Sequence, residues 1–330
     1  MSRIYEALQK AESERTSERE PLSPEQSSDE ALAHTAVAEA EFEHPAPVAE
    51  RTPLYTRPPS TVVRDSTLAA NSASLMNGGL DLSKVATRPW SPAWADLPAL
   101  LERGAAVEQF RSLRSRIFEL RDVAPLKSIL ISSGLPQEGK SFISSNLAFS
   151  LARHKNSKVL LIDGDMRRYT MHQILGCESQ PGLADYLGGK ASILDIMQRP
   201  EQPVTQPGAG DSVKQPVLPN LTFIAGGNGG DKAADLSGST RFGELIRQVS
   251  PHFDWIIVDS SPVLPVSDAV NLARSCDGVL LVARGGVTKF PVAQRAQSEL
   301  KASKILGFVL NAVQEAPQIG SYYGYDANKD

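Results

Sequence analysis

Several features are scarce in this 330-residue chain, and each absence argues against a class of protein. Its two cysteines, Cys177 and Cys276, lie far apart and form no C-x-x-C pair, so we expect a reduced, cytoplasmic protein without disulfides or a zinc site. No uninterrupted apolar run approaches the ~20 residues that a membrane-spanning helix needs. Residues 1–6 lack the apolar core of a signal peptide. The net charge of −4 does not indicate a nucleic-acid partner.

The sequence also lacks the residue patterns of a histidine metal site and of a serine nucleophile. His154, His172 and His252 have no metal-ligand spacing, and we interpret them as structural residues. Ser260 and Ser261 have no His/Asp partner in the pattern, which argues against nucleophilic catalysis by serine.

The N-terminal part of the chain is predicted to stay outside the folded domain. Residues 1–15 predict a short amphipathic helix with a narrow apolar face. Residues 16–97 are rich in Ser, Pro, Ala and Glu and poor in large apolar side chains. Such a stretch cannot bury enough surface to offset its ordering entropy, so we expect a disordered acidic linker. Short ordered pieces are allowed near Trp90 and Trp94.

Residues 98–316 have the pattern of a folded α/β domain. Apolar runs alternate with helical stretches, which predicts a doubly wound, mostly parallel sheet with helices on both faces. The strands are expected at 128–133, 158–162, 221–225, 255–258, 278–283 and 305–310, and helices at 141–154, 240–250, 267–275 and 290–302. A long surface loop is expected from residue 198 to 219, and residues 317–330 are expected to form a flexible tail.

The most informative motif is the segment 134–141, Gly-Leu-Pro-Gln-Glu-Gly-Lys-Ser, which reads G-x-x-x-x-G-K-S, a phosphate-binding loop. It follows a predicted strand and precedes a predicted helix, the arrangement that aims a helix N-terminus at phosphate groups. Lys140 is expected to reach the β- and γ-phosphates of a nucleotide, and the Ser141 hydroxyl to bind Mg²⁺. The nucleotide-binding residues expected here are Gly134, Gln137, Glu138, Gly139, Lys140, Ser141 and Phe142.

Acidic residues follow two other predicted strands. Asp163 and Asp165 come after one strand and Asp259 after another, at the sheet edge where a doubly wound fold opens its crevice. Ser141, Asp165 and Asp259 could supply the hard oxygen ligands that Mg²⁺ prefers, directly or through water. Asp163 could accept a proton from an attacking hydroxyl or water. We therefore expect Lys140, Asp163, Asp165 and Asp259 to be catalytic; the alternative is that the aspartates are turn residues capping helices.

Together, these three sites resemble the Walker A, Walker A′ and Walker B motifs of the bacterial tyrosine kinases, the BY-kinase or CpsD/CapB family of polysaccharide-export autokinases. The resemblance covers about residues 98–326, and the family is related to the MinD/ParA P-loop NTPases. The segment 108–114, Glu-Gln-Phe-Arg-Ser-Leu-Arg, is similar to the family's E-x-x-R-x-x-R helix. This implies assembly into a ring through Glu108, Arg111 and Arg114. The same charges could instead form a solvated helix face.

Two further segments resemble the family. The strand Gly-Phe-Val-Leu-Asn at 307–311 is similar to its last core strand, which implies that Asn311 lies near the nucleotide base. Tyr322, Tyr323 and Tyr325 resemble its C-terminal tyrosine cluster, the autophosphorylation target. Ser261 and Tyr169 stand where the family usually has proline, but neither replaces a phosphate or metal ligand.

The resemblance implies an ATP- and Mg²⁺-dependent protein-tyrosine autokinase that regulates exopolysaccharide or capsule biosynthesis and export. It also implies a homo-oligomer, a separate transmembrane polysaccharide co-polymerase as activator, a tyrosine phosphatase, and a peripheral position at the inner face of the cell membrane. Two alternatives stay open. A MinD/ParA-like switch ATPase carries an additional lysine five residues before the loop lysine, where this chain has Leu135. A nucleotide-binding scaffold would use the three tyrosines only to bind a partner.

Overall fold

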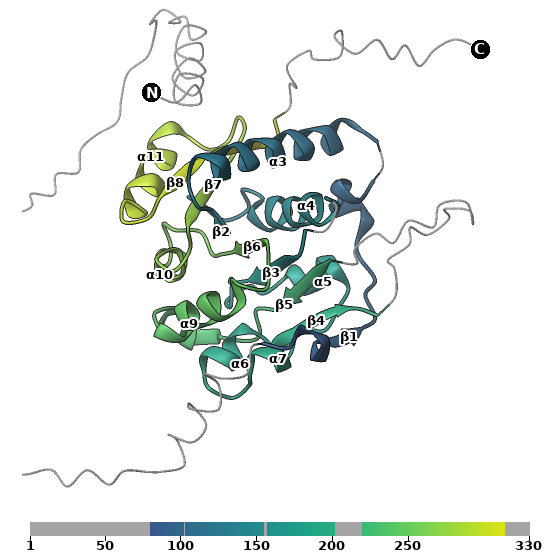
Figure 1. Cartoon of the computed structure of the whole chain (residues 1–330). Coiled ribbons are helices and arrows are strands. Elements are labelled where there is room, and N and C mark those ends of the chain that lie inside the picture. Colours follow the sequence, from purple (N-terminus) through teal and green to yellow (C-terminus); the bar gives the residue numbers. More distant parts are fainter. Residues whose placement is uncertain (1–79, 102, 155–156, 202–219, 314–330) are drawn as a thin grey trace, which may run out of the picture. The chain divides into compact units, whose positions relative to one another are not determined.

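The computed structural model of the chain describes residues 80–101, 103–154, 157–201 and 220–313. Within these ranges the chain forms one eight-stranded sheet with helices on both faces (Figure 1). The predicted N-terminal helix, most of the predicted linker and the tyrosine tail lie outside the described residues. No helix in the described residues is long and apolar enough to cross a bilayer.

The sheet confirms the predicted doubly wound, mostly parallel architecture. Its spatial order is β1-β4-β5-β3-β6-β2-β7-β8, and in the described part of the chain only β4 and β5 pair antiparallel. The strands are β1 (Ala86–Arg88), β2 (Ser128–Ser133), β3 (Val159–Asp163), β4 (Met197–Pro200), β5 (Leu221–Ile224), β6 (Trp255–Asp259), β7 (Gly278–Arg284) and β8 (Ile305–Asn311).

Helices connect most of these strands. The α-helices are α3 (Ala105–Val123), α4 (Lys140–Ala152), α5 (Met171–Leu175), α6 (Leu183–Leu187), α7 (Ile193–Ile196), α8 (Ala233–Ser237), α9 (Thr240–Val249), α10 (Asp268–Ala273) and α11 (Phe290–Glu299). Short 3₁₀ turns are η1 (Leu82–Lys84), η2 (Trp94–Asp96), η3 (Pro98–Leu100) and η4 (Gly230–Lys232).

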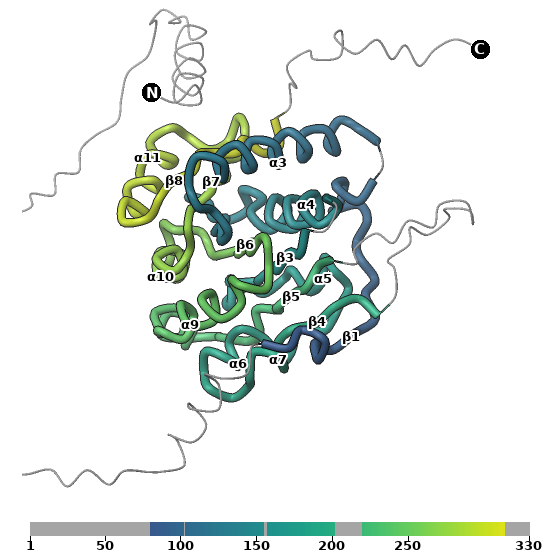
Figure 2. Tube along the Cα trace, in the orientation of Figure 1, coloured from purple at the N-terminus to yellow at the C-terminus, as the bar shows by residue number. Residues whose placement is uncertain are grey.

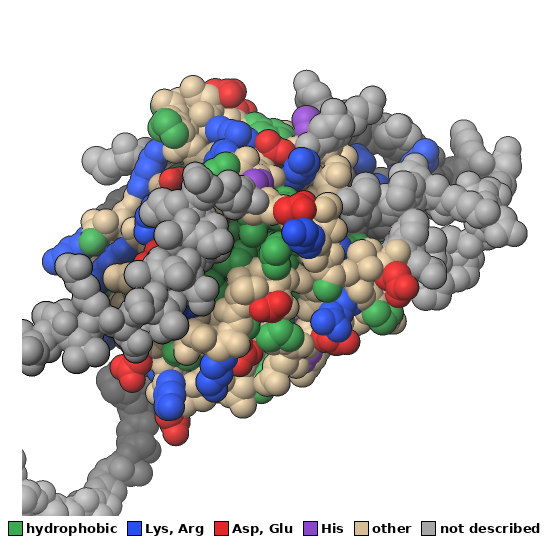
Figure 3. Space-filling model, turned by 60° about the horizontal axis from the view of Figure 1, so that its bottom comes forward, with side chains coloured by type: hydrophobic (Ala, Val, Ile, Leu, Met, Phe, Trp, Pro, Cys, Tyr) green, Lys and Arg blue, Asp and Glu red, His purple; other side chains and the backbone are tan. Residues whose placement is uncertain are grey.

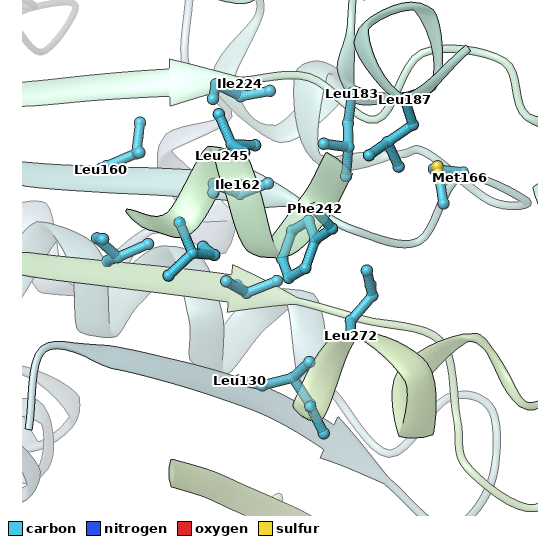
Figure 4. Close-up of a cluster of buried hydrophobic side chains, with 14 of the residues drawn as sticks. Leu130, Leu160, Ile162, Met166, Leu183, Leu187, Ile224, Phe242, Leu245 and Leu272 are labelled. Carbon is cyan, nitrogen blue, oxygen red and sulfur yellow. The ribbon is translucent and has the colours of Figure 1, made fainter. Parts of the chain in front are cut away.

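Both faces of the central strands are buried, which explains why these strands read as continuous apolar runs. In β3, Leu160 and Ile162 pack into the core under α9, and Figure 4 shows Ile162 near Phe242 and Leu245 of that helix. The alternate residues Val159 and Leu161 point to the other face of the sheet and pack into the core that α3 and α4 cover. Two hydrophobic layers therefore hold the central strands, and these strands carry the motif residues at their ends.

The ordered region begins earlier than the predicted boundary at residue 98. Strand β1 pairs in parallel with β4, so two segments more than 100 residues apart in sequence lie side by side (Figure 2). Trp90 packs edge-on against Phe223, with ring centroids 6.2 Å apart, and Leu97 is completely buried. The three residues of β1 are too few to show a strand pattern, so their sequence cannot be distinguished from that of the surrounding linker.

Strand β4 also differs from the sequence expectation, which places Gln198 to Pro200 in a surface loop. This strand contains Gln, Arg and Pro and runs antiparallel to its neighbour β5. It therefore lacks the apolar pattern of the central strands. Residues 202–219 of the expected loop lie outside the described residues.

The charges on the surface are mixed. On the face drawn in Figure 3, Lys and Arg side chains alternate with Asp and Glu rather than gathering in one basic field. This agrees with the net charge of −4 and gives a nucleic acid no positive stripe to follow on that face.

Burial of Leu97 predicts that the segment before residue 98 stabilises the domain. Leu97→Ala should lower the free energy of unfolding by about 2–5 kcal/mol, because it removes buried contacts and leaves a cavity. Val123→Ala, at a position that is 86% exposed, is the matched control and should change it little. Urea unfolding of both variants measures the difference. Equal free energies of unfolding for Leu97→Ala and Val123→Ala would mean that the segment 80–97 does not stabilise the domain.

Candidate functional site

The site lies where three central strands end. Strands β3, β6 and β2 are neighbours in that order and run parallel, so their carboxyl ends meet at one edge of the sheet. Asp163 and Asp259 are direct register partners at the ends of β3 and β6. The phosphate-binding loop follows β2 and leads into α4. The fold thus brings together the three sites that the sequence predicted separately.

The loop has the backbone conformation of an anion cradle. Gln137 and Gly139 have φ angles of +63° and +95°, which turn successive peptide groups. Within the described residues, no hydrogen bond takes up the backbone N–H groups of Gly139, Lys140 or Ser141. These donors lie at the N-terminus of α4, where the helix dipole favours negative charge. The loop therefore fits the phosphate groups of a nucleotide.

Side-chain hydrogen bonds hold the loop in place. The side chain of Glu138 is buried; it accepts a hydrogen bond from the Leu135 N–H at 2.8 Å and another from the Thr288 hydroxyl. The Asn311 side-chain amide donates to the Glu138 carbonyl at 3.0 Å. A Cβ at Gly139 would lie 1.9 Å from that amide nitrogen, so only glycine fits.

Glu138 and Asn311, both expected to contact the nucleotide, therefore stabilise the loop in this structure. Glu138 and Asn311 direct polar atoms at the loop itself, and in this way β8 and the turn before α11 support it. Sequence spacing could not find Thr288, because it lies 150 residues from Glu138.

Asp259 is the centre of the polar network beneath the loop. Its Oδ2 accepts a hydrogen bond from Ser141 Oγ at 2.5 Å, and its Oδ1 accepts one from Ser144 Oγ at 2.9 Å. Burial raises the pKa of Asp259 to about 6, although the Lys140 charge and the two hydroxyls act in the opposite direction. Ser144 is a site residue that the motif did not predict; its position one turn after Lys140 was the available signal.

Asp163 is a buried carboxylate that is bound by backbone N–H groups. Its two oxygens accept the backbone N–H groups of Asp165 and Met171 at 3.1 and 3.2 Å. Burial, with smaller contributions from Asp259 and Asp165, raises the pKa of Asp163 well above its usual range, and the two N–H groups offset part of this. A group in this state is suited to taking up a proton. Asp165 accepts the Arg168 N–H at 3.1 Å.

The donor set suits Mg²⁺ held together with phosphate. Ser141, Asp165 and Asp259 offer hard oxygen atoms near the cradle. In the described residues, no group of three or more His, Cys, Asp or Glu forms a metal cage by itself. Magnesium usually keeps several waters and binds through one or two carboxylates plus substrate phosphates, so a cage is not required.

One further ion pair, between exposed Arg167 and buried Asp268, joins the loop after β3 to α10. Arg167 binds Asp268 of α10 through Nε at 2.7 Å and Nη2 at 3.4 Å, and Asp268 is 1% exposed. This pairing raises the pKa of Arg167. Asp268 is 101 residues away from Arg167 along the chain, so local spacing does not predict this contact.

The two positions that differ from the family's prolines are accommodated without touching the ligands. Ser261 follows β6, and its carbonyl accepts the Ser132 hydroxyl at 2.8 Å, which ties the turn to β2. Tyr169 lies against Gly226, where a Cβ would come within 2.7 Å of the Tyr169 Cβ, and it stacks on His172 at 5.8 Å.

The charged residues of α3 point in two directions. Glu108 and Arg111 are exposed and form an ion pair with each other. Arg114 is half-buried, and its Nη1 donates to the Ser150 carbonyl of α4 at 2.7 Å. The predicted surface therefore includes the first two residues, whereas Arg114 faces α4. Tyr322, Tyr323 and Tyr325 lie outside the described residues.

Comparisons with known proteins agree with this geometry, although no protein-family model matches the chain. The chain is similar to tyrosine-protein kinase YwqD of Bacillus subtilis (strain 168), with 32% identity over 68% of this chain and 87% of the relative. It is 31% identical to tyrosine-protein kinase ptk of Acinetobacter johnsonii over 77% of this chain, but it spans only 33% of that relative. The solved kinase domain of Escherichia coli tyrosine kinase ETK superposes with a TM-score of 0.58, at 28% identity, over 70% of this chain and 91% of that domain.

The close approach of β3 and β6 gives a prediction for Gly164. A Cβ at this position would lie 2.5 Å from the Asp259 carbonyl oxygen, so Gly164→Ala should separate the two acidic strand ends. We expect a loss of roughly 1–3 kcal/mol of stability, as for other overpacked sites, and weaker binding of Mg-ADP. Gly238→Ala is the control, because its Cβ would meet its nearest atom at an ordinary 3.5 Å. Calorimetric titration with Mg-ADP checks this, and wild-type affinity in Gly164→Ala would refute it.

Proposed function

The chain belongs to the bacterial tyrosine-protein kinase family, and from this premise we propose that it is an ATP-dependent protein-tyrosine autokinase that regulates exopolysaccharide or capsule biosynthesis and export. The observation that supports the proposal most is the position of Asp163, a buried carboxylate with a raised pKa. It is the register partner of Asp259, which ends the strand beside β2 and its phosphate-binding loop. The chain spans about a third of the longer relatives, so its substrates and partners are part of the proposal.

Nucleotide binding would use the open end of α4. The free N–H groups of Gly139, Lys140 and Ser141 would donate to phosphate oxygens, and the Lys140 ammonium would balance their charge. Bound Mg²⁺ would neutralise the charge that develops on the phosphates, with Ser141, Asp165 and Asp259 as its protein ligands. Glu138 and Asn311 would keep the loop in the receiving conformation.

The proton of the substrate hydroxyl would go to Asp163. Phosphoryl transfer to a tyrosine forms a bond from the phenolic oxygen to the γ-phosphorus and breaks the bond to ADP, so the phenolic proton needs an acceptor. The N–H groups of Asp165 and Met171 fix the orientation of the Asp163 carboxylate. A raised pKa makes this carboxylate a stronger base than an exposed aspartate.

The proposed substrates are Tyr322, Tyr323 and Tyr325 of a neighbouring subunit. They occur in a segment with Gly320 and Gly324 near the C-terminus, and the assignment rests on the sequence and the family resemblance. A ring of subunits would bring one tail to the next site, and the exposed Glu108–Arg111 pair of α3 offers a surface for that contact. A separate transmembrane co-polymerase would activate the kinase, and a tyrosine phosphatase would reverse the reaction.

A switch ATPase of the MinD/ParA type is the competing function. That class carries a lysine where this chain has Leu135, and the Leu135 N–H is engaged by Glu138 within its own loop. The loop 134–141 contains no lysine besides Lys140, which favours the kinase over the switch ATPase.

The test separates nucleotide binding from chemistry. Asp163→Asn should keep Mg-ADP affinity but lose tyrosine phosphorylation by about 10²–10⁴-fold, because it removes the base and little volume. Lys140→Met should lose both, whereas Lys190→Met, at an exposed lysine, should lose neither. Phosphotyrosine blotting and mass spectrometry measure the reaction, and calorimetry measures binding. If Asp163→Asn phosphorylates tyrosine at the wild-type rate, Asp163 has no part in the mechanism. If the wild-type protein shows no tyrosine phosphorylation, the kinase proposal is refuted.

A further inference from the structure

One buried hydroxyl at the edge of the sheet has no hydrogen-bond partner. Ser261 is 1% exposed, and among the described residues nothing pairs with its Oγ. A buried polar atom in this state is costly, and such atoms are rare in folded proteins. The neighbouring Ser260 shows the usual situation, because its Oγ donates to the Ile131 carbonyl at 2.9 Å. Ser261 therefore carries a donor that the described part of the protein does not use.

Two hydrogen bonds hold Ser261 and the turn after it beside the phosphate-binding loop. The Ser261 carbonyl accepts the Ser132 hydroxyl at 2.8 Å. The Val263 N–H donates to the Ser133 carbonyl at 2.9 Å. Ser132 and Ser133 are the last two residues of β2, and the loop follows them directly. The unpaired hydroxyl thus belongs to a residue that is fixed at the base of this loop.

The order of the strands indicates which phosphate would lie nearest to Ser261. Strand β6 lies between β3 and β2 (Figure 1). In the proposed function, the N-terminus of α4, which follows β2, binds the β-phosphate, and Asp163 at the end of β3 takes the proton of the group that attacks the γ-phosphate. The γ-phosphate would then lie between them, over the carboxyl end of β6. Asp259 ends this strand, and Ser261 follows two residues later.

The chemistry of a serine hydroxyl suits a phosphate oxygen. The hydroxyl has one O–H donor that rotates to meet an acceptor, and a hydrogen bond to a charged oxygen is stronger than one between neutral groups. ADP ends at the β-phosphate and lacks the acceptor that ATP would bring to this place. Proline, which the family usually has at this position, has no hydroxyl, so the contact would be a property of this chain.

We propose that Ser261 is a binding residue for the γ-phosphate: its hydroxyl donates a hydrogen bond to a γ-phosphate oxygen and so distinguishes a nucleoside triphosphate from a diphosphate. The inference rests on the proposed function, because the position of the γ-phosphate follows from the role of Asp163 as the base. A triphosphate supplies the partner that the buried hydroxyl lacks, whereas a diphosphate leaves it unpaired. The contact therefore favours ATP over its product ADP.

Nucleotide binding by the full chain tests the contact without any reaction. The probes are Mg-ADP and the Mg²⁺ complex of an ATP analogue that has a non-hydrolysable imido group between its β- and γ-phosphates. In calorimetric titrations Ser261→Ala should bind the analogue at least about tenfold more weakly than the wild-type protein and bind Mg-ADP equally well, because one hydrogen bond to a charged group is lost. Ser261→Cys fills nearly the same volume with a weak donor and should show the same selective loss.

Ser260→Ala is the matched control, because Ser260 is the preceding residue and is equally buried. Its hydroxyl is already paired with the Ile131 carbonyl, so the ratio of the affinities for the analogue and for Mg-ADP should stay at the wild-type value. Wild-type affinity of Ser261→Ala for the analogue would overturn the proposal. An equal loss for the analogue and Mg-ADP would also overturn it, since the change would then act on the site as a whole.

Urea unfolding without nucleotide gives a second readout. Ser260→Ala removes a satisfied buried hydrogen bond and should lower the midpoint of unfolding. Ser261→Ala removes an unpaired hydroxyl, so its midpoint should equal or exceed that of the wild-type protein. A midpoint for Ser261→Ala as low as that of Ser260→Ala would mean that the hydroxyl already has a partner, which would contradict the proposal.

The binding assay also separates this contact from the proposed reaction. A selective loss of analogue binding in Ser261→Ala, in a wild-type protein that phosphorylates no tyrosine, would refute the kinase and support the γ-phosphate contact. Tyrosine phosphorylation by the wild-type protein, with equal analogue binding by wild type and Ser261→Ala, would support the kinase and refute the contact.

Discussion

The burial of two carboxylates side by side is the constraint on which the site depends. Asp163 and Asp259 are register partners on β3 and β6, and each is only 1% exposed. Burial disfavours the charged form of each; repulsion from Asp259 and Asp165 adds to this at Asp163, and repulsion from Asp165 adds to it at Asp259. The surroundings offset this cost: Lys140 faces Asp259, two serine hydroxyls bind it, and two backbone N–H groups bind Asp163. In the proposed function, a divalent cation bound with phosphate would complete this balance.

The same constraint explains why the surrounding backbone is so specific. Gly164 lets β3 pass close to the Asp259 carbonyl, and Gly139 leaves room for the Asn311 amide. Glu138 and Thr288 attach the loop to the turn before α11. Because hydrogen bonds to β8 and that turn hold the loop, its open N–H groups can keep one orientation for the phosphates.

Much of this arrangement could be predicted from sequence. The five interior strands β2, β3, β5, β6 and β7 were predictable close to their observed bounds because burial on both faces leaves a continuous apolar run, and the edge strand β8 was predictable from its apolar sequence. The site residues were predictable where a motif places them at strand ends. The short β1 and the polar β4 were not, because their pairing depends on neighbours rather than on their own pattern. Contacts such as Arg167–Asp268 join residues 101 positions apart, and no local spacing reveals them. The inward orientation of Arg114 likewise needed the packing of α3 on α4.

The central claim is that the loop and the two acidic strand ends form one site for a metal–nucleotide complex. A crystal of the full chain grown with ADP and Mn²⁺ in place of Mg²⁺ tests this most directly, since manganese is located by anomalous scattering and accepts similar oxygen ligands. The account predicts a manganese peak within about 3 Å of Ser141 Oγ, on the side of Asp259, with the β-phosphate over the N-terminus of α4. A peak bound elsewhere, or a nucleotide away from Lys140, would contradict it.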